Sequence, residues 1–210
     1  MMVQYILNNQ EAFLTLLGQH LNLTFLSVGL AMIFSIPLAI IGTRVPCLET
    51  PIMAFGNLGQ TIPSLVILAL AIPLVGIGFA PSLLALFLRA VLPILLNTFV
   101  GIKEVDPAVI EAARGMGMTE NQILFRVQLP LTVPVIVAGI KTATVQCVSL
   151  ATLAAFVGGG SLGDWIQQGI MMVNQTLLLA GAVPTAVLAI MANFLIGVIQ
   201  NIVTPRGLKV

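Results

Sequence analysis

Long apolar runs separated by short polar stretches make up most of the chain. Each run is long enough to cross the roughly 30 Å hydrocarbon core of a bilayer as an α-helix. The pattern predicts five membrane spans, at about residues 21–43, 52–78, 82–102, 131–157 and 184–203. Polar residues and two prolines, Pro63 and Pro73, interrupt the second run. We therefore expect this span to be broken or bent and to line protein rather than lipid.

The segments between the runs predict smaller elements. Residues 1–20 mix apolar and polar side chains and predict an amphipathic lead-in on the outer side, ahead of a transmembrane domain at 21–210. A short polar connection is expected at 46–51, and a glycine loop at 158–160. Residues 164–179 predict a weakly amphipathic helix with Trp165 as an interfacial anchor. A sixth span at 165–183 is the alternative.

The longest polar interruption is the 104–130 segment, which reads EVDPAVIEAARGMGMTENQILFRVQLP. Its charged residues are Glu104, Asp106, Glu111, Arg114, Glu120 and Arg126. Such a segment must face water or another protein. Asp106 followed by a proline predicts the start of a helix, and Gly117 predicts its end. Thr119 and Gln122 form a capping-box pattern that starts a second short helix, with Pro130 at the next boundary.

Composition supports a membrane protein. Hydrophobic residues make up 59% of the chain and charged residues only 7%, against about 25% in soluble domains. The net charge of +1 provides no basic surface for nucleic acid. Cys47 and Cys147 are isolated, so neither a disulfide framework nor a metal site is expected. The first 20 residues lack the basic start of a secretory signal peptide.

Orientation follows from the basic residues. With the amino terminus outside, seven of the eight basic residues lie on or near the cytoplasmic side: Arg44, Lys103, Arg114, Arg126, Lys141, Arg206 and Lys209. The positive-inside rule then predicts an N-out, C-in topology with a cytoplasmic 103–130 loop.

Polar side chains inside the spans are candidates for a translocation path, because they are costly there. The strongest candidates are Gln146, Ser149, Asn57, Gln60, Thr61 and Asn97. Alternatively, such groups bond between helices and hold the bundle together at about 1 kcal/mol each. For Arg89, three roles stay open: snorkelling, pairing with a partner carboxylate, or facing a water-filled cavity.

A helix pair joined to membrane spans on both sides is a lever that a partner protein can push. Glu111, Ala112 and Ala113, then Gly117 after three residues, and finally Leu129 and Pro130 match the EAA motif of ATP-binding-cassette (ABC) importer permeases. Val127 replaces the usual isoleucine. The phrases GQTIPSLVILALAIPLVGIG, LPILLNTFVGI, VDPAVIEAARGMGM and ATLAAFVGGGSLGDWI resemble the glycine betaine, carnitine and choline branch, the osmoprotectant permeases.

This resemblance implies an all-α integral membrane protein with the five-span type I ABC importer permease fold. Glu111, Ala112, Ala113 and Gly117 would form a coupling helix that docks on a cytoplasmic ATPase subunit. The expected partners are that ATPase, a second permease subunit (a second copy or a paralogue) and an extracytoplasmic substrate-binding protein. The expected location is a bacterial or archaeal inner membrane.

The chain lacks a nucleotide-binding motif, because the glycines at 158–160 are not followed by the lysine of a P-loop. We therefore expect no catalytic residue and no cofactor in this chain, with ATP bound by the partner subunit. The alternatives are an amino-acid or methionine ABC permease, an ion-coupled secondary transporter, and an intramembrane enzyme. The last two lack the internal repeats or the catalytic clusters that they need.

Overall fold

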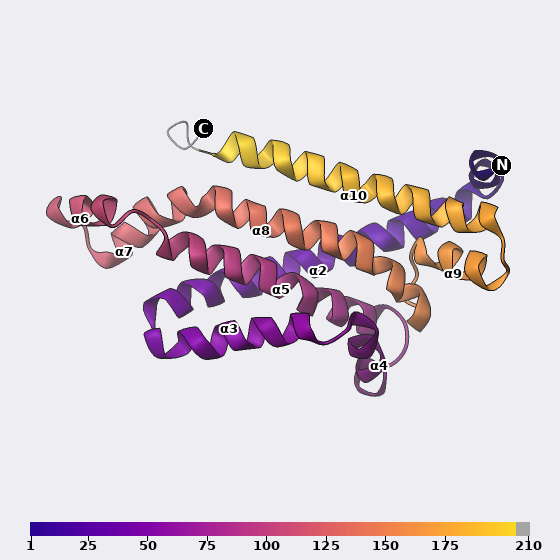
Figure 1. The fold of residues 1–210 in the computed structure, drawn as a ribbon, viewed down its shortest axis with the longest axis horizontal. Coiled ribbons are helices and arrows are strands. Elements are labelled where there is room, and N and C mark those ends of the chain that lie inside the picture. Colours follow the sequence, from indigo (N-terminus) through magenta and orange to yellow (C-terminus); the bar gives the residue numbers. More distant parts are fainter. Residues whose placement is uncertain (205–210) are drawn as a thin grey trace.

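The computed structural model describes residues 1–204, and nearly all of that range is helical, with no strand in it. In chain order the elements are α1 (Met2–Asn8), α2 (Gln10–Arg44), α3 (Pro46–Thr61), α4 (Ser64–Val75), α5 (Phe79–Lys103), α6 (Pro107–Gly115), α7 (Glu120–Ile123), η1 (Leu124–Gln128), α8 (Leu129–Leu150), η2 (Ala151–Val157), α9 (Gly163–Met171) and α10 (Gln175–Val203). The long helices α2, α5, α8 and α10 form an elongated bundle (Figure 1). The predicted all-α fold is confirmed.

Four helical stretches are long and apolar enough to cross a membrane: Gln10–Arg44, Phe79–Lys103, Glu120–Val157 and Gln175–Val203. α3 and α4 meet the same criterion only as a pair, and the pair bends by 100° at its break. The break lies at Ile62 and Pro63, because a residue that precedes proline is driven out of the helical conformation. The predicted interruption of the second apolar run is confirmed, and its crossing of the membrane as a single span stays a prediction.

Two boundaries near the amino terminus differ from the predictions. Residues 46–51 are helical rather than a polar connection, because α3 begins at Pro46 and proline suits the first turn of a helix. α2 begins at Gln10, so this helix extends well before the predicted first span.

The helix predicted at 164–179 is interrupted. α9 ends at Met171, and Val173 then takes a positive φ of 52°. The Asn174 side chain caps the start of α10 by accepting a hydrogen bond from a backbone N–H at 3.2 Å. α10 therefore starts earlier than the predicted last span.

The second helix of the 104–130 segment is not short. α7 continues through the π-helical turn η1 into α8, so one helix runs from Glu120 to Val157. Pro130 does not end it, contrary to the prediction. A π-helical turn bonds each carbonyl to the fifth residue along, which accommodates the missing N–H of Pro130 at the start of α8.

α5 is the central helix and packs against α2, α3, α4 and α8. It is antiparallel to α8, and three contacts fix the register. The Thr132 hydroxyl donates to the Gly101 carbonyl at 3.0 Å, a Cβ on Gly139 would lie 2.7 Å from the Pro93 carbonyl oxygen, and the Cys147 thiol donates to the Leu86 carbonyl at 3.6 Å. The missing side chain at Gly139 allows this close approach of the two helices.

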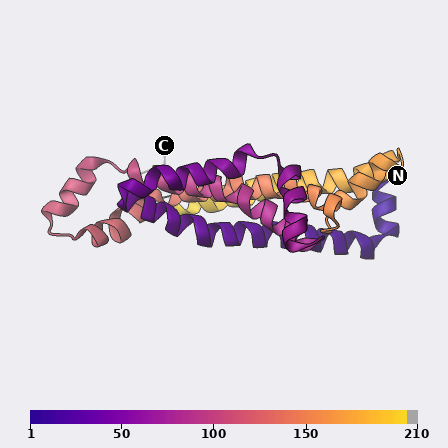
Figure 2. The same cartoon turned by 90° about the horizontal axis from the view of Figure 1, so that it is seen from below.

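The two ends of the bundle differ. α6 and α7 extend beyond the long helices at one end, which we call the loop end (Figure 2). α1 and α9 lie at the opposite end, which we call the N-terminal end (Figures 1 and 2). α10 runs from the N-terminal end towards the loop end.

Candidate docking and translocation sites

The 104–130 segment forms the predicted helix and corner. The Asp106 side chain accepts a hydrogen bond at 2.8 Å from a backbone N–H in the first turn of α6. After α6, Gly117 turns the chain with a φ of +80°, a conformation that favours glycine. Thr119 and Gln122 make the predicted capping box at the start of α7. Local spacing therefore accounts for the start of α6, the corner after it and the start of α7.

The motif residues divide between the surface and the interior. Glu111 and Ala112 are exposed on α6, whereas Ala113 is only 2% exposed. Leu129 is half-buried and Pro130 is exposed, on the helix that continues into the bundle. Within the described chain, Glu111 forms no ion pair. The outer surface of α6 thus presents an unpaired carboxylate beside a small side chain, where another protein can approach closely.

Three charged residues connect α6 to the bundle. The Glu120 carboxylate lies 2.8 Å from Arg114 Nε and 3.5 Å from Arg44 Nη1, and Arg44 Nη2 also donates to the Glu120 backbone carbonyl at 2.8 Å. The hydrogen bond that Arg114 donates to the Glu120 carboxylate raises the pKa of Arg114. A cavity of about 140 Å³ lies beside these side chains. Glu120 therefore links the end of α2 to the end of α6, a role that the sequence did not reveal.

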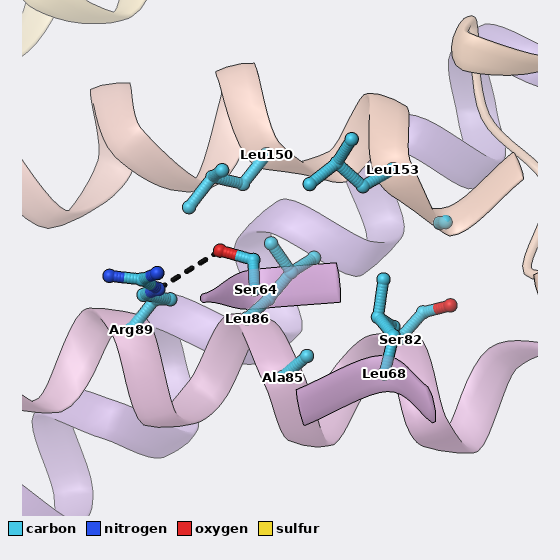
Figure 3. Close-up of a pocket in the computed structure, with 9 residues that line it drawn as sticks. Ser64, Leu68, Ser82, Ala85, Leu86, Arg89, Leu150 and Leu153 are labelled. Atoms are coloured by element: carbon cyan, nitrogen blue, oxygen red, sulfur yellow. Dashed lines mark hydrogen bonds between the residues drawn. The ribbon is translucent and has the colours of Figure 1, made fainter. Parts of the chain in front are cut away.

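Arg89 lies on α5 beside the break between α3 and α4 (Figure 3). Its guanidinium donates hydrogen bonds to the backbone carbonyls of Gln60 and Ile62, each at 2.9 Å, and to the Ser64 hydroxyl at 3.0 Å. The Gln60 amide donates in return to the Arg89 carbonyl at 2.9 Å. In a regular helix that carbonyl would bond to residue 93, but Pro93 has no N–H. Arg89 and Gln60 therefore satisfy backbone groups that two helix interruptions leave free.

This arrangement adds contacts that none of the roles left open for Arg89 includes. Within residues 1–204 it pairs with no carboxylate. It does line a small cavity of about 10 Å³ together with Ser64, Ser82 and Leu150 (Figure 3), a volume at the lower limit for one water molecule. Its main contacts are nevertheless backbone carbonyls, a partner class that sequence alone does not indicate.

The other pathway candidates lie on three different helices. Asn57 and Thr61 are exposed on α3, and Ser149 is exposed on α8. Asn97 donates to the Pro93 carbonyl of its own helix at 2.7 Å. The Gln146 amide oxygen is buried and has no hydrogen-bond partner in the described range. None of these residues lines the cavity beside Arg89, and their pathway role stays a prediction.

The predicted orientation counted Lys141 among the residues near the cytoplasmic side. In the structure, however, Lys141 does not lie near the end of its span. The antiparallel register places it level with about residue 91, near the middle of α5. The predicted orientation also counted Arg206 and Lys209. These two residues lie outside the described residues. Arg44, Lys103, Arg114 and Arg126 remain at the loop end.

Trp165 is not an interfacial anchor. It is only 5% exposed, and its ring packs against Tyr5, with centroids 5.4 Å apart, and against Phe13, with centroids 5.9 Å apart. α1 and the start of α2 cover α9 at the N-terminal end, and this brings together aromatic residues that are far apart in the sequence.

Comparison with known proteins identifies close relatives of the whole chain. The family described as "Binding-protein-dependent transport system inner membrane component" matches residues 32–208. The glycine betaine/carnitine/choline transport system permease protein OpuCB of Bacillus subtilis is 40% identical over 99% of this chain and 96% of its own length. The osmoprotectant import permease protein OsmW of Salmonella typhimurium is 38% identical over 99% of both chains.

Solved structures share the fold. A structure of the MetNI methionine ABC transporter in an inward-facing conformation has a chain that superposes with a TM-score of 0.80 at 25% identity, covering 89% of this chain and 94% of that one. An amino acid ABC transporter superposes with a TM-score of 0.80 at 18% identity, covering 94% and 97%. These likenesses confirm the predicted importer permease fold.

Proposed function

This chain belongs to the family of inner membrane components of binding-protein-dependent transport systems, and from that premise we propose that it is the permease subunit of an ATP-driven importer of osmoprotectants. The solutes are of the glycine betaine, carnitine and choline type. The observation that carries this proposal is identity of 38–40% to osmoprotectant permeases over almost the whole chain. The transporters of methionine and other amino acids share the fold at 25% and 18% identity, which supports that alternative substrate class less.

The geometry supports a division of labour between subunits. ATP is bound and hydrolysed by a cytoplasmic partner, and α6 docks on it through Glu111, Ala112 and the corner at Gly117. A second permease subunit completes the pathway, and an extracytoplasmic binding protein delivers the solute. ATP binding then shifts the permease pair between inward-open and outward-open states by its different affinity for the two.

The orientation in this proposal is N-out and C-in. Arg44, Lys103, Arg114 and Arg126 all lie at the loop end, and an excess of basic residues is typical of cytoplasmic loops. This places α6 on the same side of the membrane as the ATPase.

Uptake in reconstituted vesicles tests the proposal. Radiolabelled glycine betaine should accumulate only when the permease, the ATPase, the binding protein and ATP are all present. Glu111→Lys reverses the charge on the exposed surface of α6. We expect the ATPase to receive the Glu111 carboxylate with basic groups, so a lysine there would face like charges, and uptake should fall by at least tenfold.

Glu104→Lys is the matched control, since Glu104 is also exposed and lies in the same loop, just after α5. This variant should retain most of the uptake. Accumulation driven by an ion gradient without ATP would contradict the importer, and equal uptake by the two variants would contradict docking through Glu111.

A further inference from the structure

Carboxylates and cations are distributed differently along the chain. All seven carboxylates lie outside the five predicted spans: Glu11, Glu49, Glu104, Asp106, Glu111, Glu120 and Asp164. Two cations lie inside these spans, Arg89 on α5 and Lys141 on α8. The spans therefore carry positive charge with no negative charge of their own to balance it.

Lys141 lies deep in the bundle. It follows Gly139, which packs against Pro93, and it is therefore level with the middle of α5. The nearest carboxylate along its own continuous helix is Glu120, about 30 Å away at a rise of about 1.5 Å per residue. No carboxylate of the same helix can reach the Lys141 ammonium.

The two deep cations have different surroundings. Arg89 is held by the carbonyls and the hydroxyl at the break between α3 and α4. Lys141 forms no ion pair with any residue in 1–204. Its ammonium lies over Gly197 of α10, where an added Cβ would be 3.5 Å from Nζ. The side chain is only half-buried, and its neighbour Thr142 is exposed, so the rest of the described chain does not cover this flank of α8.

The ammonium lies beside Gly197, six residues before the end of α10 and still within the predicted span 184–203. An ionised group without a partner inside a span is costly, and such groups mark the routes of ions and substrates. A second copy of this chain would not balance Lys141, because its spans contain no carboxylate either. We propose that Lys141 binds the carboxylate of the solute during passage, so that the permease favours zwitterionic osmoprotectants, such as glycine betaine and carnitine, over choline. This inference rests on the proposed function.

The discrimination follows from the charges of the solutes. Glycine betaine and carnitine carry a carboxylate besides their quaternary ammonium group, and a lysine can donate a charge-assisted hydrogen bond to it. Choline carries a hydroxyl in place of the carboxylate, so its only charge has the same sign as Lys141 and Arg89. Lys141 is therefore attractive to the first class and repulsive to the second.

The test compares uptake of glycine betaine and of choline by the complete transporter in vesicles, with the same binding protein throughout. In Lys141→Gln, betaine uptake should fall about tenfold or more, the loss expected for one charge-assisted hydrogen bond. Choline uptake should stay constant or rise. Lys141→Arg should keep the preference for betaine, because the positive charge remains.

Two further variants make the outcome decisive. Lys141→Met provides the same readout if the glutamine variant fails to assemble, since methionine is readily accommodated in apolar surroundings. Arg126→Gln removes an exposed charge at the loop end and should leave the betaine-to-choline ratio unchanged. Equal losses of betaine and choline uptake in Lys141→Gln and Lys141→Met, which would leave the betaine-to-choline ratio unchanged, would overturn this inference alone. A wild-type transporter that took up neither solute would overturn the proposed function as well.

Discussion

Gly117 is the residue at which the 104–130 segment turns. Its φ of +80° lies in the left-handed region, and a Cβ there would contact nothing within 4 Å. A side chain would therefore introduce backbone strain without a steric clash. We expect Gly117→Ala to cost about 1–2 kcal/mol at this corner, and to displace α6 enough to lower ATP-dependent uptake several-fold in reconstituted vesicles.

Gly115 provides the matched control. It is the last residue of α6, it has an ordinary φ, and an added Cβ would also contact nothing within 4 Å. Gly115→Ala should leave uptake unchanged and stabilise the helix by about 0.5–1 kcal/mol. If both alanine variants lowered uptake to the same degree, the backbone conformation of Gly117 would not be the cause.

The sequence predicted hydrogen bonds whose two partners are close in the chain. The Asp106 cap and the Thr119–Gln122 capping box span two and three residues, so their spacing alone indicates the hydrogen bonds. The partners of Arg89 and Arg44 are tens of residues away. Their contacts depend on how the helices pack, which the spacing does not encode.

At the element scale, the break between α3 and α4 depends on α5. Arg89 and Gln60 satisfy backbone carbonyls on both sides of that contact. Arg89→Met would leave the carbonyls of Gln60 and Ile62 without these donors. Because Arg89 is half-exposed, we expect the free energy of unfolding to fall by about 2 kcal/mol, which is the lower end of the range for two unsatisfied carbonyl groups. The apparent unfolding temperature in detergent should fall by about 5 °C.

Arg126→Met is the control for that measurement, since Arg126 is exposed and forms no ion pair in the described chain. It should leave the unfolding temperature within about 2 °C, as expected for a surface change of less than about 0.5 kcal/mol. The double variant Arg89→Met with Gln60→Leu should lose less free energy of unfolding than the two single variants lose together, because both side chains belong to one hydrogen-bond network. Strict additivity would contradict the reciprocal contact.

At the scale of the whole molecule, hydropathy predicted the spans but not their arrangement. The apolar runs located the long helices because a span must satisfy its backbone internally. Two details depend on tertiary contacts instead: the covering of Trp165 by α1 and α2, and the depth of Lys141 relative to α5. The positive-inside count treated Lys141 as a cytoplasmic residue, since the sequence does not show how far α8 extends before it enters the bundle.

Cys47 allows the proposed orientation to be tested in the native chain. It is exposed in the first turn of α3, whereas Cys147 is buried. Glu49, two residues further on, pairs with Lys103 at 2.6 Å, which places Cys47 at the loop end. If this end is cytoplasmic, a membrane-impermeant maleimide should label wild-type protein in inverted vesicles and not in intact cells.

Gln10→Cys in a Cys47→Ser background tests the opposite end of the bundle. Gln10 is exposed at the start of α2, so this cysteine should be labelled in intact cells and protected in sealed inverted vesicles. The two thiols must report opposite sides, because one continuous α2 connects them. Labelling of Cys47 from outside would reverse the topology and place α6 away from any cytoplasmic ATPase. Docking through Glu111 depends on this orientation, so the labelling experiment tests both.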